Sequence, residues 1–169
     1  MSTKRLFFAL WPDNRQRDRL RDVINSVAKT VEGRAVDRRN WHVTLPFIGQ
    51  LDERQIPDLQ ELAAQVQVEP FRLVFDRLEF WARPKVACLA AAAVPTELEN
   101  LVSSLNDVLH LVGVSPEDRT YRPHITVSRN ARAFTTERLA QRVTTQWSGF
   151  ELMESVSGAG GVAYVPLKQ

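Results

Sequence analysis

The sequence predicts one α+β domain over residues 1–169, built from two fused lobes that face one another, with mostly antiparallel strands. A chain of 169 residues can bury most of its apolar surface in one core. Candidate strands alternate with amphipathic helices, but several strands follow one another over short links, which is typical of antiparallel pairing. Each half of the chain also contains a strand, a long helix and a second strand with the same short pattern, and no linker separates the halves.

The first half of the chain alternates apolar runs with stretches of helical periodicity. Residues 6–11 form an apolar run that is too short for a signal peptide or a membrane span, so they predict a buried strand. Beyond this run, apolar residues recur at the i, i+3, i+4 and i+7 positions of two helices. The expected elements are a strand at 6–11, a helix that Asp13 or Asn14 caps and Gly33 ends, a strand at 41–48, and a helix that Asp52 begins with Gln55 as its capping-box partner.

The second half is expected to contain more strand than helix. Short extended runs follow one another before a long helix, and that helix begins at Pro95 and Thr96 and stops at Gly113. The expected elements are strands at 71–75, 78–81 and 86–91, a helix at 95–113, a strand at 124–128, a short helix at about 136–143, and strands near 150–156 and 162–167.

The charge of the chain is nearly balanced, although its cations are unusual. Arginine outnumbers lysine by 18 to 4, and the formal net charge is only +2. This excludes a polybasic protein that coats nucleic acid through many phosphate contacts. A cluster of arginines without any acid lies at residues 119–132, and such a local positive field suits a pocket for one phosphate group. From this cluster we expect Arg122 and Arg129 to lie near a phosphate.

Cys88 is the single cysteine and lies in an apolar run. It cannot form an internal disulfide, and no cation flanks it to stabilise a thiolate, so we expect a buried, non-catalytic thiol in a cytoplasmic protein. No apolar run approaches the length of a membrane helix. We therefore expect a protein that does not contact a membrane. We also expect a monomer.

Two of the three histidines occur in matching motifs. His42-Val43-Thr44-Leu45 and His124-Ile125-Thr126-Val127 both read His, aliphatic, Thr, aliphatic, and they start 82 residues apart. Successive side chains of a strand point to opposite faces, so His and Thr share one face while the aliphatic residues share the other. The pattern predicts two strands that anchor through their aliphatic faces and present imidazole and hydroxyl groups to a cleft.

Paired imidazoles beside paired hydroxyls suit the opening of a cyclic phosphodiester. One group must accept a proton from water and another must give a proton to the leaving ribose oxygen, and imidazole does either near pH 7. Threonine hydroxyls can donate hydrogen bonds to the non-bridging phosphate oxygens. These considerations identify His42 and His124 as an acid–base pair without deciding which is the acid, and Thr44 and Thr126 as phosphate ligands.

Both motifs and their flanking residues resemble a known group of enzymes. The segments WHVTLPFIG at 41–49 and RPHITVSR at 122–129 resemble the paired motifs of the two-histidine (2H) phosphoesterase superfamily. More narrowly, they resemble those of the bacterial RNA 2′,3′-cyclic phosphodiesterases (LigT-like). The resemblance extends over nearly the whole chain through RLFFAL at 5–10, WARPKV at 81–86, ESV at 154–156 and Tyr164.

The resemblance implies a bilobal, pseudo-twofold fold in which two mostly antiparallel sheets face a central cleft and helices lie outside. It implies hydrolysis of the 2′,3′-cyclic phosphate end of an RNA or nucleotide to a 2′-phosphate, with no metal or other cofactor. On the family pattern His42 would be the proton donor and His124 the proton acceptor, with Thr44 and Thr126 holding the phosphate. Pro46 departs from the pattern, since the family often has a polar or basic residue there.

Several alternatives remain open at this point. Each His-x-Thr could be an ordinary strand with a structural histidine, although two matched copies argue against this. A metal site is disfavoured because neither histidine has a partner at ligand spacing, and His110 is expected to be structural, near the end of a helix. Related enzymes could act on 2′,5′-linked or other cyclic nucleotides. A non-catalytic module that binds RNA ends would belong to a different class, and it would not need both histidines.

Overall fold

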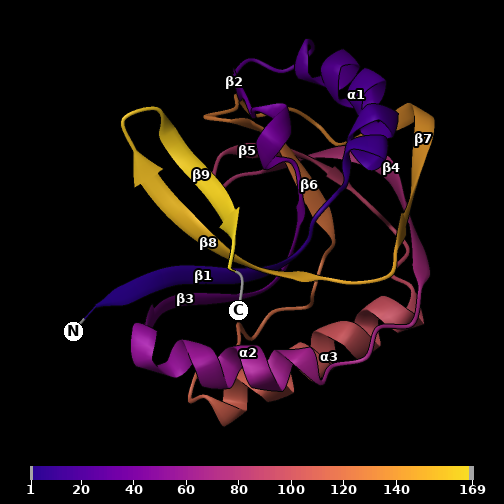
Figure 1. Cartoon of the computed structure of the whole chain (residues 1–169). Helices are drawn as coiled ribbons and strands as arrows, with labels where there is room; N and C mark the ends of the chain where they lie inside the picture. Colours follow the sequence, from indigo (N-terminus) through magenta and orange to yellow (C-terminus); the bar gives the residue numbers. More distant parts are fainter. Residues whose placement is uncertain (1, 168–169) are drawn as a thin grey trace.

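The computed structural model describes residues 2–167, whose strands and helices form an α+β fold (Figure 1). The predicted α+β class and the antiparallel pairing are confirmed, since every strand pair is antiparallel. In chain order the elements are β1 (Thr3–Leu10), α1 (Asn14–Ala28), β2 (Arg34–Ala35), η1 (Arg38–Asn40), β3 (Val43–Asp52), η2 (Glu53–Gln55), α2 (Ile56–Ala64), β4 (Phe71–Trp81), β5 (Val86–Ala90), α3 (Thr96–Leu111), β6 (His124–Arg129), β7 (Glu137–Trp147), β8 (Glu151–Gly158) and β9 (Gly161–Pro166), where η marks a 3₁₀ helix.

The strands form two groups that meet at a single point. One group has the order β7-β4-β5-β6 and the other the order β3-β1-β8-β9, and β3 pairs with β6 through Val43 opposite Ile125. Two separate sheets were expected, but this pair joins them into one continuous sheet. Val43 and Ile125 occupy the same position in the two histidine motifs, so the joint brings together the equivalent points of the two halves.

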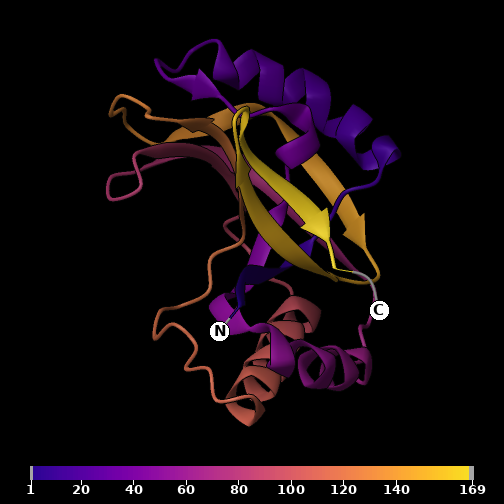
Figure 2. The ribbon, with the colours of Figure 1, turned by 60° about the vertical axis from the view of Figure 1, so that its left-hand side comes forward.

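The helices cross between the two strand groups. Helix α1 follows β1 in the chain but contacts β6 and β7 of the other group, whereas α3 follows β5 and contacts β3. Figures 1 and 2 show α2 and α3 side by side on one side of the molecule and α1 on the opposite side. Each half of the chain therefore covers strands of the other half. None of the helices within residues 2–167 is both long enough and apolar enough to span a bilayer.

Helix α1 begins where its sequence predicts and ends earlier. The Asp13 side chain accepts a hydrogen bond from the Gln16 backbone N–H at 2.8 Å, which caps the first turn. The helix stops at Ala28, ahead of Gly33. Gly33 has a different role, since a Cβ there would lie 2.6 Å from Ser128 Oγ and 2.9 Å from the Arg129 carbonyl oxygen. A glycine is therefore needed for the close approach of this segment to β6.

The predicted start of the second helix also differs in detail. Asp52 caps η2 by accepting a hydrogen bond from the Arg54 backbone N–H at 2.9 Å, and α2 follows directly. The Gln55 side chain does not complete a capping box. It donates instead to the Val112 carbonyl oxygen at 2.9 Å, which ties the start of α2 to the end of α3.

One predicted helix is wrong. The segment expected to be helical at about 136–143 belongs to strand β7, which pairs along β4 from Phe71 opposite Trp147 to Leu78 opposite Glu137. Its side chains alternate, with Val143, Thr145 and Trp147 buried and the residues between them exposed. Pairing with β4 overrides the weak helical periodicity of the segment. Strand β4 is itself continuous, with a register shift between Phe75 and Arg77 where two strands were expected.

Candidate active site

The two histidine motifs meet where β3 and β6 pair. Antiparallel pairing of Val43 with Ile125 points both aliphatic side chains into the core, where each is fully buried. The side chains on either side of this pair are only partly buried and lie on the opposite face. The register sets His42 toward Thr126 and Thr44 toward His124. The predicted shared face of the two histidines and two threonines is therefore confirmed.

Both imidazoles are oriented by the same local bond. His42 Nδ1 lies 2.7 Å from the Asn40 carbonyl oxygen, and His124 Nδ1 lies 2.9 Å from the Arg122 carbonyl oxygen. A carbonyl oxygen can only accept, so Nδ1 carries the hydrogen in each ring. In the neutral form, Nε2 is then the nitrogen with a free lone pair, available to exchange a proton with a ligand. The two rings thus have the same tautomer and the same anchor two residues upstream.

Aromatic side chains surround His42. Its ring stacks on Trp11 with centroids 5.6 Å apart and an interplanar angle of 25°, and it meets the edge of Tyr164 at 5.0 Å. Phe7 lies at 5.2 Å. Because Nδ1 is the donor, Nε2 accepts the hydrogen bond from the Thr44 hydroxyl at 2.9 Å. These contacts fix the ring on three sides and leave its proton-exchanging nitrogen beside a threonine.

The charge near His42 is positive. Arg129 donates to the Tyr164 hydroxyl at 3.2 Å, which keeps its guanidinium on this side of the site. Burial, with His124 and Arg129 nearby, lowers the pKa of His42 to about 4, although the bond to the Asn40 carbonyl acts in the opposite direction. Without a ligand, His42 is therefore neutral at pH 7.

The surroundings of His124 include a carboxylate. Trp81 packs on the His124 ring with centroids 4.0 Å apart. The buried Glu79 accepts hydrogen bonds from Trp81 Nε1 at 2.9 Å and from Arg122 Nη2 at 2.5 Å. The Arg122 guanidinium in turn lies 5.1 Å from the centre of the Trp81 ring. Glu79 thus holds both the ring that packs on His124 and the residue whose carbonyl orients it.

The pKa of His124 is also lowered, chiefly by burial and further by Arg122. The bond to the Arg122 carbonyl and the Glu79 carboxylate act in the opposite direction. A buried carboxylate next to an imidazole favours the charged ring, and the pKa of His42 is raised by no such group. The two motifs therefore share their local geometry and differ in their electrostatic surroundings.

The two arginines expected near a phosphate have different positions. Arg129 lies on the His42 side with its guanidinium exposed beside Tyr164. Arg122 is bound by Glu79, so its fork supports the His124 side rather than standing free. The other arginines of the 119–132 cluster form ion pairs elsewhere, Arg119 with Glu117 and Arg132 with Glu32. The Thr126 hydroxyl forms no hydrogen bond with any other residue in the range 2–167 and is open to a ligand.

The sequence motifs do not mark Glu79, Trp11, Phe7 or the backbone carbonyls that support the two histidines. Glu79 is an acid in an otherwise apolar strand end, and this is a signal that could have marked it. Trp11 and Phe7 look like ordinary core residues of β1 and its end. The carbonyl oxygens of Asn40 and Arg122 belong to the backbone and leave no trace in the sequence. His110 lies exposed in the last turn of α3, outside the site.

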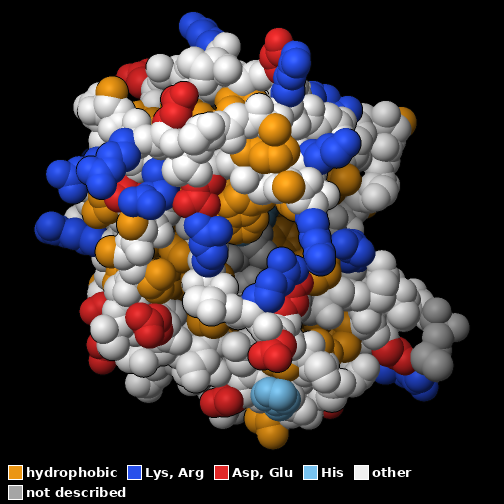
Figure 3. Space-filling view, turned by 180° about the vertical axis from the view of Figure 1, so that it is seen from behind, with side chains coloured by type: hydrophobic (Ala, Val, Ile, Leu, Met, Phe, Trp, Pro, Cys, Tyr) orange, Lys and Arg blue, Asp and Glu red, His pale blue; other side chains and the backbone are white. Residues whose placement is uncertain are grey.

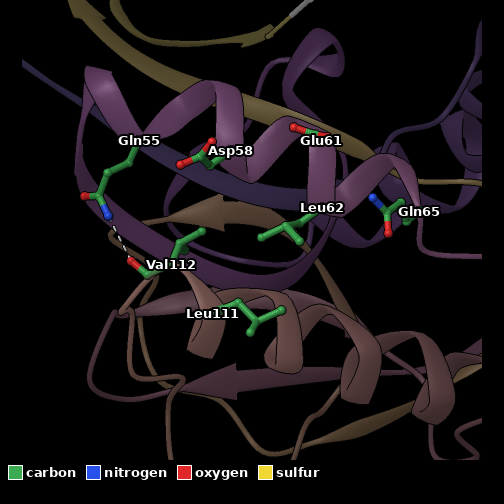
Figure 4. A pocket seen from close by; sticks show the side chains of 7 residues that line it. All are labelled: Gln55, Asp58, Glu61, Leu62, Gln65, Leu111 and Val112. Atoms are coloured by element: carbon green, nitrogen blue, oxygen red, sulfur yellow. Dashed lines mark hydrogen bonds between the residues drawn. The ribbon is translucent and has the colours of Figure 1, made fainter.

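The surface offers two further features for comparison. Figure 3 shows a face on which Lys and Arg side chains surround a hollow with apolar walls, an arrangement that suits an anionic ligand with an aromatic part. The hollow between α2 and α3 is different, because it contains Asp58, Glu61 and the exposed Leu111 and no histidine (Figure 4). Among residues 2–167, no three His, Cys, Asp or Glu side chains cluster closely enough to hold a metal ion.

The chain is similar in sequence to a known family of proteins. Residues 10–88 match the family described as LigT like Phosphoesterase. The RNA 2′,3′-cyclic phosphodiesterase of Escherichia coli K12 is 30% identical over 138 residues, which cover 81% of this chain and 78% of that protein. The protein of the same name from Aeropyrum pernix is 32% identical over 115 residues, or 66% of this chain and 64% of that protein.

Solved structures show the same fold over almost the whole chain. The crystal structure of E. coli LigT complexed with 3′-AMP superimposes with a TM-score of 0.86 at 29% identity, and the match covers 99% of this chain and 97% of that one. A crystal structure described as a phosphoesterase gives a TM-score of 0.87 at 28% identity with the same coverage.

Proposed function

Because this chain belongs to the family of LigT-like phosphoesterases, we propose that it hydrolyses the 2′,3′-cyclic phosphate end of an RNA or nucleotide to a 2′-phosphate. The observation that carries the proposal is the pair of imidazoles at the β3–β6 joint, both with Nδ1 bound to a carbonyl and Nε2 available for proton exchange. Two such groups on one face match a reaction that needs one proton removed and another delivered.

The reaction breaks one ester bond of the ring. Water attacks phosphorus, and its proton passes to Nε2 of His124. The bond between phosphorus and the ribose 3′ oxygen breaks, and that oxygen receives the proton carried by Nε2 of His42. The 2′ ester remains, so the product is the 2′-phosphate. Thr44 and Thr126 donate hydrogen bonds to the non-bridging oxygens, where negative charge builds in the transition state.

The roles of the histidines set a condition on protonation. The lowered pKa of His124 suits a base, since the ring is neutral when water must be deprotonated. His42 has a pKa of about 4 in the free protein, so as a donor it must gain its proton when substrate binds. The phosphate anion favours this gain, because a nearby negative charge raises the pKa of an imidazole. Arg129 contributes to the positive field that attracts the anion.

The protein is further proposed to act as a cytoplasmic monomer without a metal or other cofactor. The single cysteine agrees with a reducing compartment, since Cys88 is buried and burial raises the pKa of its thiol to about 12. Such a thiol has neither a disulfide partner nor a useful thiolate fraction at neutral pH.

One incubation tests reaction, product and cofactor together. Adenosine 2′,3′-cyclic phosphate is mixed with the protein in EDTA, and the product is identified by phosphorus NMR. Conversion to adenosine 2′-phosphate is expected at the same rate with and without EDTA. Formation of the 3′-phosphate would refute the assigned bond cleavage, and loss of turnover in EDTA would refute the metal-independent mechanism. A parallel incubation with a 2′,5′-linked dinucleotide tests the alternative substrate class.

A further inference from the structure

Arg17 is a cation whose side chain has no hydrogen-bond or ion-pair partner among residues 2–167. It lies in the first turns of α1, and its Nε is buried with no hydrogen-bond acceptor among residues 2–167. None of the described acids forms an ion pair with it, although ten other such pairs are present in the same part of the chain. A buried guanidinium nitrogen without an acceptor is costly, and an anion bound to the guanidinium would offset part of this cost.

The charges around Arg17 do not neutralise it. Arg38 is close enough to lower the pKa of Arg17, in addition to the larger effect of burial. Asp13 acts in the opposite direction, but its carboxylate accepts from the backbone N–H of Gln16 at the helix cap. Asp18 is bound to Arg38 at 2.5 Å. The net charge around Arg17 is therefore positive, and an anion bound there would reduce the repulsion between Arg17 and Arg38.

Arg17 is linked to the candidate site through one aromatic ring. Its Cζ lies 5.3 Å from the centre of the Trp11 ring, and Trp11 stacks on His42 at 5.6 Å. The Trp11 ring therefore contacts both the guanidinium and the imidazole. A ribose places its 5′ phosphate on the side away from its 2′,3′ edge, so a nucleotide held at His42 by that edge directs its second anion away from the imidazole.

The two sides of the site differ in the charge they offer to that second anion. On the His124 side, Arg122 is already bound by Glu79. On the His42 side, Arg17 has no acid bound to it, and Arg129 donates only to a phenol. On the His42 side, an RNA chain leaving the site thus meets unneutralised cations where Trp11 and Arg17 lie.

We propose that Arg17, held against Trp11, binds the phosphate on the 5′ side of the terminal nucleotide, and that this makes the protein selective for RNA ends over isolated nucleoside cyclic phosphates. This inference deepens the proposed function and depends on it for the placement of the 2′,3′ edge at His42. The contact is a charge-assisted hydrogen bond, which corresponds to an affinity gain of about 10- to 100-fold.

The test compares two product-like ligands by calorimetry, so it does not require turnover. Adenosine 2′,5′-bisphosphate should bind the wild-type protein about 10-fold or more tightly than adenosine 2′-monophosphate. In Arg17→Gln, which keeps a polar side chain but removes the charge, the ratio of the two dissociation constants should fall close to one. Arg17→Lys should retain part of the ratio through its charge.

Arg15→Gln is the matched control. Arg15 is exposed two residues before Arg17 on α1 and carries the same charge. If Arg15→Gln lowers the ratio as much as Arg17→Gln, only the general field of the protein matters and the inference is wrong. It is equally wrong if the wild-type protein does not distinguish the two ligands, or binds neither. Hydrolysis of adenosine 2′,3′-cyclic phosphate in the same preparation decides the proposed function separately.

Discussion

His42 and His124 are held by the same bond but lie in different environments. In both motifs Nδ1 binds the carbonyl two residues upstream, which the short motif itself provides. Around His42 the neighbours are aromatic rings and cations from β1, β6 and β9, whereas around His124 they include the buried Glu79 of β4. The orientation of each imidazole is therefore set by residues close to it in sequence, whereas its pKa depends on elements that are distant in sequence.

The largest expected effect is the loss of turnover when either histidine is replaced. His42→Ala and His124→Ala should each lower kcat by about 1,000-fold, within the range for a lost general acid or base. Affinity for adenosine 2′-phosphate should fall far less, since the threonines and Arg129 remain. Steady-state kinetics and calorimetry measure the two quantities. Near wild-type turnover in either variant would falsify the paired mechanism.

The pH dependence of stability separates the two histidines. The pKa of His42 is about 4 in the folded protein and 6.5 in the unfolded chain, so the unfolded chain binds the extra proton as the pH falls from 6.5 to 4. His42 should therefore cost about 3 kcal/mol of stability across this window. Urea unfolding should show that the free energy of unfolding falls less between pH 7 and pH 4 in His42→Asn than in the wild type.

His124→Asn provides the comparison for that measurement. The pKa of His124 is lowered in the same direction, but Glu79 partly offsets the effect of burial. Replacement of His124 should therefore reduce the loss of stability between pH 7 and pH 4 by less than replacement of His42 does. Equal recovery in the two variants would mean that Glu79 does not distinguish the sites.

The threonines should differ in a smaller but specific way. Thr44→Val and Thr126→Val each remove a donor to the phosphate and should lower kcat/KM by about 10- to 100-fold. Only Thr44 also donates to a histidine, at 2.9 Å from His42 Nε2, and this bond favours the neutral ring. Thr44→Val should therefore alter the pH–rate profile as well, whereas Thr126→Val should lower the profile without shifting it.

The smallest expected effect concerns Glu79 as a positioning residue. Glu79→Gln keeps an acceptor for Trp81 but removes the negative charge of Glu79. In the wild type this charge binds Arg122 and raises the pKa of His124, so the substitution should lower that pKa. We expect kcat/KM to fall by about 10-fold, which is the worth of one charge-assisted bond. The acid limb of the pH–rate profile should move to lower pH, a change that a purely structural role would not cause.

Asp18→Asn is the matched control for Glu79→Gln, because it removes the carboxylate that binds Arg38 on the His42 side. Asp18 does not contribute to the shift in the pKa of either histidine, so the pH–rate profile should keep its shape. A shift in Asp18→Asn equal to that in Glu79→Gln would assign the effect to net charge rather than to Glu79.

The sequence predicts those parts of the fold and site that depend on local pattern. The alternation of His42-Val43-Thr44 and His124-Ile125-Thr126 is confirmed by the burial of Val43 and Ile125 and the partial exposure of their neighbours. The helix that begins at Thr96 is also confirmed. In both cases one face is strongly apolar, so the period of the pattern determines the structure.

What the sequence does not predict depends on pairing between distant segments. Residues 137–147 have weak helical spacing near Leu139 and Val143, but β4 supplies a partner strand that the local pattern does not reveal. Likewise Glu79 and Trp81 reach His124 only because β4 and β6 both pair with β5. Side chains that set acidity come from such pairings, so motif reading identifies the reacting groups and not their pKa values.

The position of β1 between β3 and β8 has a consequence for protein synthesis. His42 and β1 leave the ribosome early, but β1 has only one neighbour until residues 151–158 have been made. Tyr164, which closes the ring around His42, comes later still. Contacts that span most of a chain form late in folding. A nascent chain therefore holds His42 without its full set of aromatic neighbours until β9 has been made.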